Sequence, residues 1–154
     1  MTIATVPMGG VFATKAVRDA FLTGPETMPD LFHGYTYSGH PRASAAAIAT
    51  LDVYRDEGVF ENAAAMAPVW EDMLHSLSDM PGVIDIRNAG LLGAVQLESD
   101  GPVGARARAV YETAWEKGLI VRPIGDSLAM SPPLTIDAAT IGQIGDILGQ
   151  VMSA

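Results

Sequence analysis

The chain has 154 residues, of which 49% are hydrophobic and 18% charged, which suits one domain or a piece of a larger one and excludes a wholly disordered chain. The 9 Lys+Arg and 18 Asp+Glu give a formal net charge of −9, which disfavours binding to nucleic acid or to an anionic membrane surface. The sequence contains no cysteine, which excludes disulfides, thiolate metal sites and cysteine nucleophiles.

The first part of the chain shows few regular elements. Residues 11–13, Val-Phe-Ala, follow a loop rich in Pro and Gly and predict a short buried strand. Residues 15–21 predict a short helix. Residues 33–41 carry several hydroxyl groups, two glycines and a proline, which excludes a regular helix there.

From residue 42 onward, helices alternate with pairs of strands. Apolar side chains recur at helical spacing in the expected helices, and Val95 and Leu97 alternate with polar neighbours as in a half-buried strand. We expect helices over residues 42–57, 61–77, 102–117 and from Asp137 onward, and strands over residues 83–87, 92–98, 119–121 and 128–130. This order predicts an α+β layer, in which helices cover a small mixed or antiparallel sheet.

No apolar run approaches the roughly 18 residues that span a bilayer. Residues 1–5 lack the basic region and the long apolar stretch of a secretory signal. We therefore expect a soluble, cytoplasmic protein.

The hydroxyl-rich loop around Thr36 is a candidate anion site. It directly precedes an expected helix, and the free N–H groups and positive dipole end of a helix N-terminus attract anions. The alternative is a turn whose hydroxyl groups bond their own backbone.

Arg122 is a candidate binding residue for a carboxylate. It ends an expected strand before a Pro-Ile-Gly-Asp turn, and its planar guanidinium matches the two oxygens of a carboxylate. The alternative is a structural ion pair with Asp126 or another acid.

The histidines and lysines give weaker indications of a functional site than the loop around Thr36 and Arg122 do. His33 and His40 flank the loop, but Asp30 is the only nearby acid, so we expect no metal site there. Lys15 and Lys117 are the two lysines of the chain. We expect Lys15 to be solvated and Lys117, near the end of its helix, to interact favourably with the helix dipole.

The string FHGYTYSGHP at residues 32–41 resembles the class-III aminotransferases, which use pyridoxal 5′-phosphate (PLP). The strings RNAGLLG at residues 87–93, GLIVRPIGDSL at 118–128 and SPPL at 131–134 resemble the same family in order and spacing. The resemblance covers essentially the whole chain. The first string and the VRP-x-GD motif point to the branch that transfers ω-amino groups or amines to pyruvate.

The resemblance implies an α/β architecture, namely the C-terminal part of the PLP-dependent transferase fold, fold-type I. Residues 1–50 would be the remnant of the large PLP-binding domain, and residues 51–154 the small C-terminal α+β domain. In the family, the threonine at the position of Thr36 binds the phosphate of PLP held by the neighbouring subunit of a homodimer, with Tyr35 beside it. The arginine at the position of Arg122 grips the substrate α-carboxylate and swings aside for an amine that lacks one.

The sequence departs from the family pattern at its start. The family's essential lysine, which carries PLP as a Schiff base, belongs to a segment that runs into the stretch at residues 6–9, so we expect it to stand just before Met1. Lys15 matches a later, non-catalytic position. The resemblance therefore implies a C-terminal portion without its own Schiff-base lysine.

Three functions follow from these observations. The first is an aminotransferase that moves an amino group from an ω-amino acid or amine to pyruvate or a similar keto acid, active when whole. The second is a non-catalytic fragment or pseudoenzyme that dimerises with a full-length aminotransferase and lends it Thr36. The third, an unrelated acidic binding module, would require several motifs to match by chance. The sequence leaves the amino donor open among β-alanine, γ-aminobutyrate, taurine, putrescine and aromatic amines.

Overall fold

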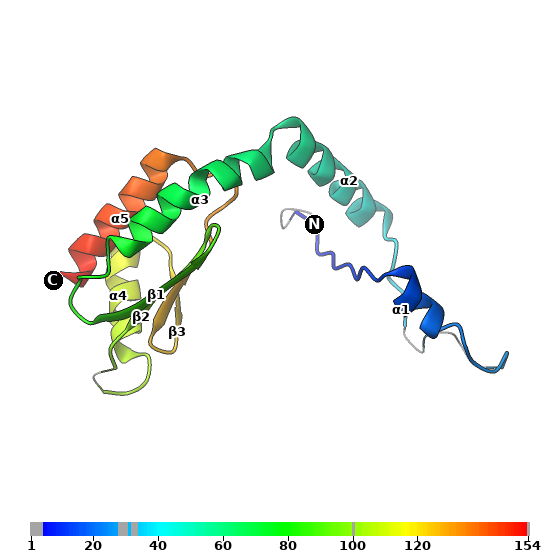
Figure 1. The fold of residues 1–154 in the computed structure, drawn as a ribbon, viewed down its shortest axis with the longest axis horizontal. Coiled ribbons are helices and arrows are strands. Elements are labelled where there is room, and N and C mark those ends of the chain that lie inside the picture. Colours follow the sequence, from blue (N-terminus) through cyan, green and yellow to red (C-terminus); the bar gives the residue numbers. More distant parts are fainter. Residues whose placement is uncertain (1–4, 28–30, 32–33, 100, 154) are drawn as a thin grey trace. The chain divides into compact units, whose positions relative to one another are not determined.

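The computed structural model divides the chain into two compact units, Met1–Glu57 and Gly58–Ala154 (Figure 1). The described residues are 5–27, 31, 34–99 and 101–153.

The described residues of the first unit form two helices, α1 (Lys15–Ala20) and α2 (Pro41–Asp56). The Thr14 hydroxyl begins α1 by accepting a hydrogen bond of 3.4 Å from the amide of Val17. Proline suits the first position of α2, because its φ is already helical and its missing N–H would have had no partner within the helix. Both helices agree with the sequence prediction.

The strand predicted at residues 11–13 is wrong. These residues have no regular structure, and the side chains of Val11 and Phe12 are 98% and 87% exposed. An apolar triplet predicts burial only where other elements cover it, and within this unit the described residues do not cover these side chains.

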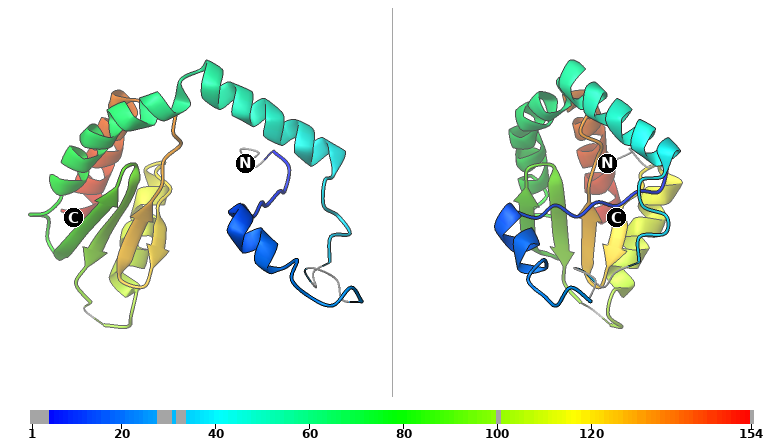
Figure 2. Two further views of the ribbon diagram at one scale, coloured as in Figure 1. Left: turned by 45° about the vertical axis from the view of Figure 1, so that its right-hand side comes forward. Right: turned by 90° about the vertical axis from the view of Figure 1, so that its right-hand side faces the viewer.

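The second unit is a four-stranded antiparallel sheet with three helices. In chain order its elements are α3 (Val59–His75), β1 (Val83–Ala89), β2 (Leu92–Leu97), α4 (Ala105–Glu116), β3 (Arg122–Ile124), β4 (Ser127–Met130) and α5 (Ala138–Met152). The strand order is β1-β2-β4-β3. Helix α3 packs on β1 and β2, α4 packs on β3 and β4, and α5 packs on both helices (Figures 1 and 2). The predicted α/β class, with α+β layers in the C-terminal part, is confirmed.

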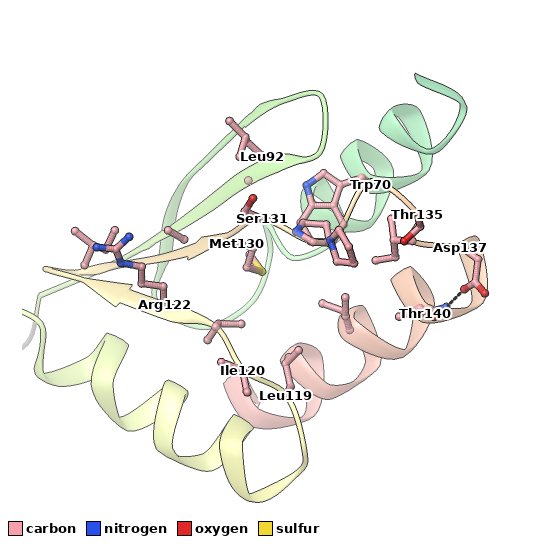
Figure 3. Close-up of a pocket in the computed structure, with 18 residues that line it drawn as sticks. Trp70, Leu92, Leu119, Ile120, Arg122, Met130, Ser131, Thr135, Asp137 and Thr140 are labelled. Atoms are coloured by element: carbon pink, nitrogen blue, oxygen red, sulfur yellow. Dashed lines mark hydrogen bonds between the residues drawn. The ribbon is translucent and has the colours of Figure 1, made fainter. Parts of the chain in front are cut away.

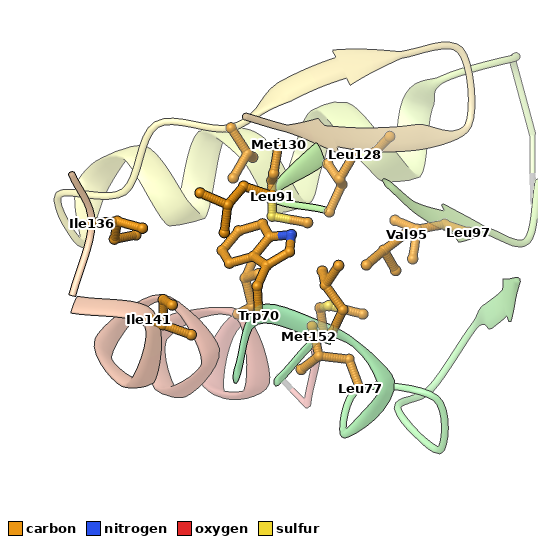
Figure 4. Close-up of a cluster of buried hydrophobic side chains, with 14 residues drawn as sticks. Trp70, Leu77, Leu91, Val95, Leu97, Leu128, Met130, Ile136, Ile141 and Met152 are labelled. Atoms are coloured by element: carbon orange, nitrogen blue, oxygen red, sulfur yellow. The ribbon is translucent and has the colours of Figure 1, made fainter. Parts of the chain in front are cut away.

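The core of this unit lies between the sheet and the helices (Figure 4). Strand β2 contributes alternate residues, because successive side chains of a strand point to opposite faces of a sheet. The largest fully buried side chains are Trp70, Leu74, Leu77, Val95, Leu97, Leu128, Ile141 and Leu148.

Glycine at position 93 allows α3 to approach β2 closely. A Cβ atom there would lie 2.5 Å from Cδ1 of Leu74 and 2.9 Å from Nε1 of Trp70, which is too close for either contact. The indole of Trp70 is 1% exposed, and its Nε1 is the one buried side-chain polar atom without a hydrogen-bond partner among the described residues.

The strand predicted at residues 119–121 lies three residues further on, as β3. Pro123 sits in this strand opposite Leu128, although proline cannot donate a backbone hydrogen bond. It is tolerated because β3 is an edge strand with only β4 beside it in the sheet. The shift makes Arg122 the first residue of a strand, opposite Ala129, instead of the residue that ends the strand predicted before it.

Among the described residues, no helix is both long enough and apolar enough to cross a membrane.

Candidate functional site

Each unit contains a pocket lined by residues that the sequence singled out. The pocket of the first unit, which we call the loop pocket, has a volume of about 600 Å³. Residues 7–9 form one part of its lining, and residues 34–40 with Ala43 form the rest. Tyr35 and Thr36 therefore line the same pocket.

The loop pocket lies at the N-terminus of α2. The N-cap residue His40 makes no side-chain capping bond in the described structure, and Pro41 has no N–H. The next two backbone amides, those of Arg42 and Ala43, therefore have no side chain of the N-cap residue as an acceptor. These amides can donate to a bound anion, and the helix dipole favours negative charge at this end.

The hydroxyl groups of the loop add further donors. The turn is closed by a backbone bond of 2.9 Å, in which Ser38 N–H donates to the carbonyl of Tyr35. The hydroxyl groups of Thr36 and Ser38 make no hydrogen bond to other described residues, so the alternative of hydroxyls that bond their own backbone finds no support here. The donor set suits a phosphate, whose oxygens all accept hydrogen bonds.

The pocket of the second unit, which we call the arginine pocket, has a volume of about 830 Å³ (Figure 3). Arg122, the first residue of β3, lines one end of it, and the segment that follows β4 forms the opposite part of the lining. Much of the lining is apolar and includes Leu119, Ile120, Met130, Pro132, Ile136 and Ile144.

The guanidinium of Arg122 is exposed and has no carboxylate within ion-pair distance in the described part of the chain. The structural alternative was a pair with Asp126, but Oδ1 of Asp126 instead accepts a hydrogen bond of 2.6 Å from the amide of Gly104. An arginine with this freedom, beside an apolar wall, can take a ligand carboxylate in a bidentate pair.

An acid that lines the arginine pocket has a structural role. Asp137 is the N-cap of α5, and its Oδ1 accepts a hydrogen bond of 2.7 Å from the amide of Thr140. This bond lowers the pKa of Asp137 below its ordinary value of 3.8. The carboxylate thus stabilises the helix and stays charged at neutral pH.

Sequence reasoning missed Asn62, which fixes part of the pocket lining. Its Nδ2 donates to the carbonyls of Leu134, at 2.7 Å, and Ile136, at 3.0 Å. These partners lie more than 70 residues away in the sequence, so no local pattern could reveal the contact. The contribution of residues 7–9 to the loop pocket was also missed, because these residues meet residues 34–40 only in the folded chain.

The other candidate residues of the sequence lie outside the two pockets or outside the described residues. Asp30 and His33 lie outside the described residues, and so does Phe32 of the string at residues 32–41. Lys15 pairs with Asp19, and Nζ of Lys117 donates to Oε1 of Gln150 at 3.3 Å.

Comparison with known proteins gives consistent matches. The family model described as "Aminotransferase class-III" matches residues 1–152. An omega-aminotransferase from Caulobacter vibrioides is 43% identical over 156 residues, which cover 98% of this chain and 36% of that protein. A beta-alanine–pyruvate aminotransferase from Pseudomonas aeruginosa is 36% identical over 156 residues, which cover 99% of this chain and 35% of that protein.

A solved structure agrees with these matches. The omega transaminase from Pseudomonas jessenii in complex with PMP superposes with a TM-score of 0.73 at 34% identity, covering 79% of this chain and 28% of that one. The chain spans only about 36% of the first of the curated relatives described above. Its sequence and its fold point to the same enzymes, which depend on pyridoxal 5′-phosphate. The chain therefore belongs to the class-III aminotransferase family.

Proposed function

We propose that this chain is part of an aminotransferase that moves an amino group from an ω-amino acid or an amine to pyruvate or a similar keto acid. The observation that supports this most is the unpaired guanidinium of Arg122 in the arginine pocket, because pyruvate and every ω-amino carboxylic acid present a carboxylate. The printed names of related proteins, such as the beta-alanine–pyruvate aminotransferase, agree with substrates of this class.

The donors of the loop pocket fit the phosphate of PLP. Thr36 would contribute its hydroxyl, Tyr35 would lie beside it, and the first free amides of α2 would add backbone donors. When bound, PLP acts as an electron sink for the carbon that carries the amino group. In line with the family resemblance, we assign residues 1–50 to the PLP-binding domain and residues 51–154 to the small domain. Thr36 would serve the neighbouring subunit of a homodimer, or of a full-length relative.

Arg122 would bind and orient the substrate. A bidentate pair fixes the carboxylate in direction as well as in distance, and this holds the reacting end of the substrate in one place. The apolar residues of the lining would contact the carbon atoms of the substrate. An amine substrate lacks the carboxylate, and the guanidinium can then move away because no described acid holds it.

The binding role of Arg122 is tested by titrating the chain with pyruvate and following its amide NMR shifts at constant ionic strength. We expect saturable shifts at Arg122 and Ala129, and the substitution Arg122→Leu should abolish them. Arg122→Lys should bind several-fold more weakly than wild type, because an ammonium keeps the charge but loses the planar fork. Equal binding by Arg122→Leu would contradict the role.

The chemistry is tested by borohydride reduction of the chain mixed with PLP, followed by intact mass and identification of any modified residue. We expect no stoichiometric adduct on Lys15 or Lys117, because neither matches the family's Schiff-base position. A specific adduct on either lysine would show that the required lysine lies within the chain.

Transfer itself is measured as alanine formed from pyruvate with β-alanine, γ-aminobutyrate, taurine, putrescine or an aromatic amine as donor. We expect amino transfer by a polypeptide that contains both this chain and a Schiff-base lysine at the position that the family pattern gives it. If that polypeptide transfers no amino group while this chain co-purifies with a longer aminotransferase, the non-catalytic alternative holds instead.

A further inference from the structure

We propose that Asn62 is a positioning residue that holds the wall of the arginine pocket in the shape required for carboxylate binding. This inference rests on the proposed role of Arg122. Asn62 lies in the first turn of α3, outside the pocket lining, and acts through the segment that follows β4.

Asn62 donates both hydrogens of its side-chain amide to that segment. Nδ2 donates to the carbonyl of Leu134 at 2.7 Å and to the carbonyl of Ile136 at 3.0 Å, and the Asn62 side chain is half-buried. An amide N carries two donors, so these two bonds satisfy it completely. The two carbonyls flank Thr135, so the contact fixes the backbone on both sides of that residue.

The segment held in this way is part of the arginine pocket. Residues 131–133 line the pocket together with Thr135 and Ile136, and the segment begins two positions after Ala129, the residue opposite Arg122 in the sheet. One backbone bond within the segment, from the amide of Ile136 to the carbonyl of Pro133, measures 3.0 Å. Two of these residues are prolines, which donate no backbone hydrogen bonds, so the bonds from Asn62 carry much of the ordering.

The consequence for function is that Asn62 holds the wall of the pocket at the end opposite Arg122, without lining the pocket itself (Figure 3). A bidentate pair is directional, so a carboxylate gains most from it when the surrounding wall keeps the ligand aligned. A displacement of about 1 Å in a supporting shell can weaken a site substantially. Loss of the two bonds should therefore weaken carboxylate binding while α3 and the sheet remain folded.

The test compares neutral variants of two half-buried asparagines. Asn62→Leu removes both bonds with little change in volume, and Asn62→Gln keeps the donors but displaces them by one methylene. The matched control is Asn88→Leu, because Nδ2 of Asn88 donates to Glu71 at 3.2 Å and Asn88 does not line the arginine pocket. The dissociation constant of pyruvate is measured by NMR from the amide of Arg122, and hydrogen exchange of Ile136 reports on the segment.

We expect Asn62→Leu to raise the dissociation constant about five- to tenfold, with a smaller rise for Asn62→Gln. Asn88→Leu should stay within about twofold of wild type. Unchanged affinity in Asn62→Leu, together with faster exchange at Ile136, would show a purely structural role and overturn the inference. If Asn62→Leu does not fold, Asn62→Gln decides by the same criterion. Absence of pyruvate binding in the wild-type chain would instead refute the proposed role of Arg122, and the inference with it.

Discussion

The side chain of Asp126 accepts a hydrogen bond of 2.6 Å from the backbone amide of Gly104. This bond joins the turn between β3 and β4 to the start of α4, where the N-cap is a glycine and supplies no side-chain cap of its own. The carbonyl of Asp126 also accepts a bond of 2.8 Å from the amide of Leu97. The acid closest in sequence to Arg122 thus serves the fold and leaves the arginine for a ligand.

The first prediction follows from this division of roles. Asp126→Ala should lower the free energy of unfolding by about 1–2 kcal/mol, because it leaves the Gly104 amide without its partner. Asp126→Asn keeps an acceptor oxygen at that position and should lose less. Neither change should alter pyruvate binding at Arg122. Chemical denaturation and the NMR titration measure the two effects, and stronger pyruvate binding in Asp126→Asn would reveal an ion pair that the structure does not contain.

The second prediction concerns the hydroxyl of Thr36. Thr36→Val keeps the shape of the side chain and removes a donor, so it should weaken binding of inorganic phosphate or PLP to the chain several-fold. Thr36→Ser should restore most of the affinity. Thr135→Val, which makes the same change in the other pocket, is the control. The affinities are measured by PLP absorbance and by phosphate titration, and identical binding by Thr36→Val and wild type would remove Thr36 from the phosphate site.

The third prediction compares two glycines of α5. A Cβ atom at Gly142 meets nothing within 4 Å, so Gly142→Ala should stabilise the chain by about 0.5–1 kcal/mol through helix propensity. A Cβ atom at Gly145 would lie 2.8 Å from Cγ of Met73. Overpacking costs about 1–3 kcal/mol, which exceeds the gain in propensity, so Gly145→Ala should destabilise. Thermal unfolding of both variants tests this, and equal stabilisation would mean that Met73 moves aside freely.

The elements of the second unit could be predicted from the sequence because they carry strong local signals. Apolar spacing located α3 and β2, and Asp137 indicated the start of α5, where it forms the predicted N-cap. The strand before Asp126 was misplaced because Pro123 reads as a turn residue, while its place on an edge strand depends on which strands pair. Residues 11–13 were misjudged because an apolar triplet carries no information about what covers it.

The candidate site was predictable only in part. Local features singled out Thr36, in a hydroxyl-rich loop before a helix, and Arg122, at the end of an expected strand, and the family resemblance implied a role for each. Asn62 and Gly93 were not, since their importance comes from contacts between elements, namely the bonds of Asn62 to the segment after β4 and the approach of α3 to β2. Such contacts join residues far apart in the chain and leave no local pattern.

The last prediction concerns the pH dependence of stability. The hydrogen bond from the Thr140 amide lowers the pKa of Asp137 in the folded chain below 3.8, the ordinary value that we take for the unfolded chain. A carboxyl group with a lowered folded pKa contributes stability that is fully present above the unfolded pKa and is lost as the pH falls through the folded pKa. Asp137→Asn keeps an acceptor but cannot titrate, so it should lower the melting temperature at pH 7 and flatten its decline below about pH 4. The measurement is the melting temperature of both chains from pH 7 to pH 3, with Asp79→Asn as the control. A parallel decline in wild type and Asp137→Asn would show that Asp137 contributes nothing to acid unfolding.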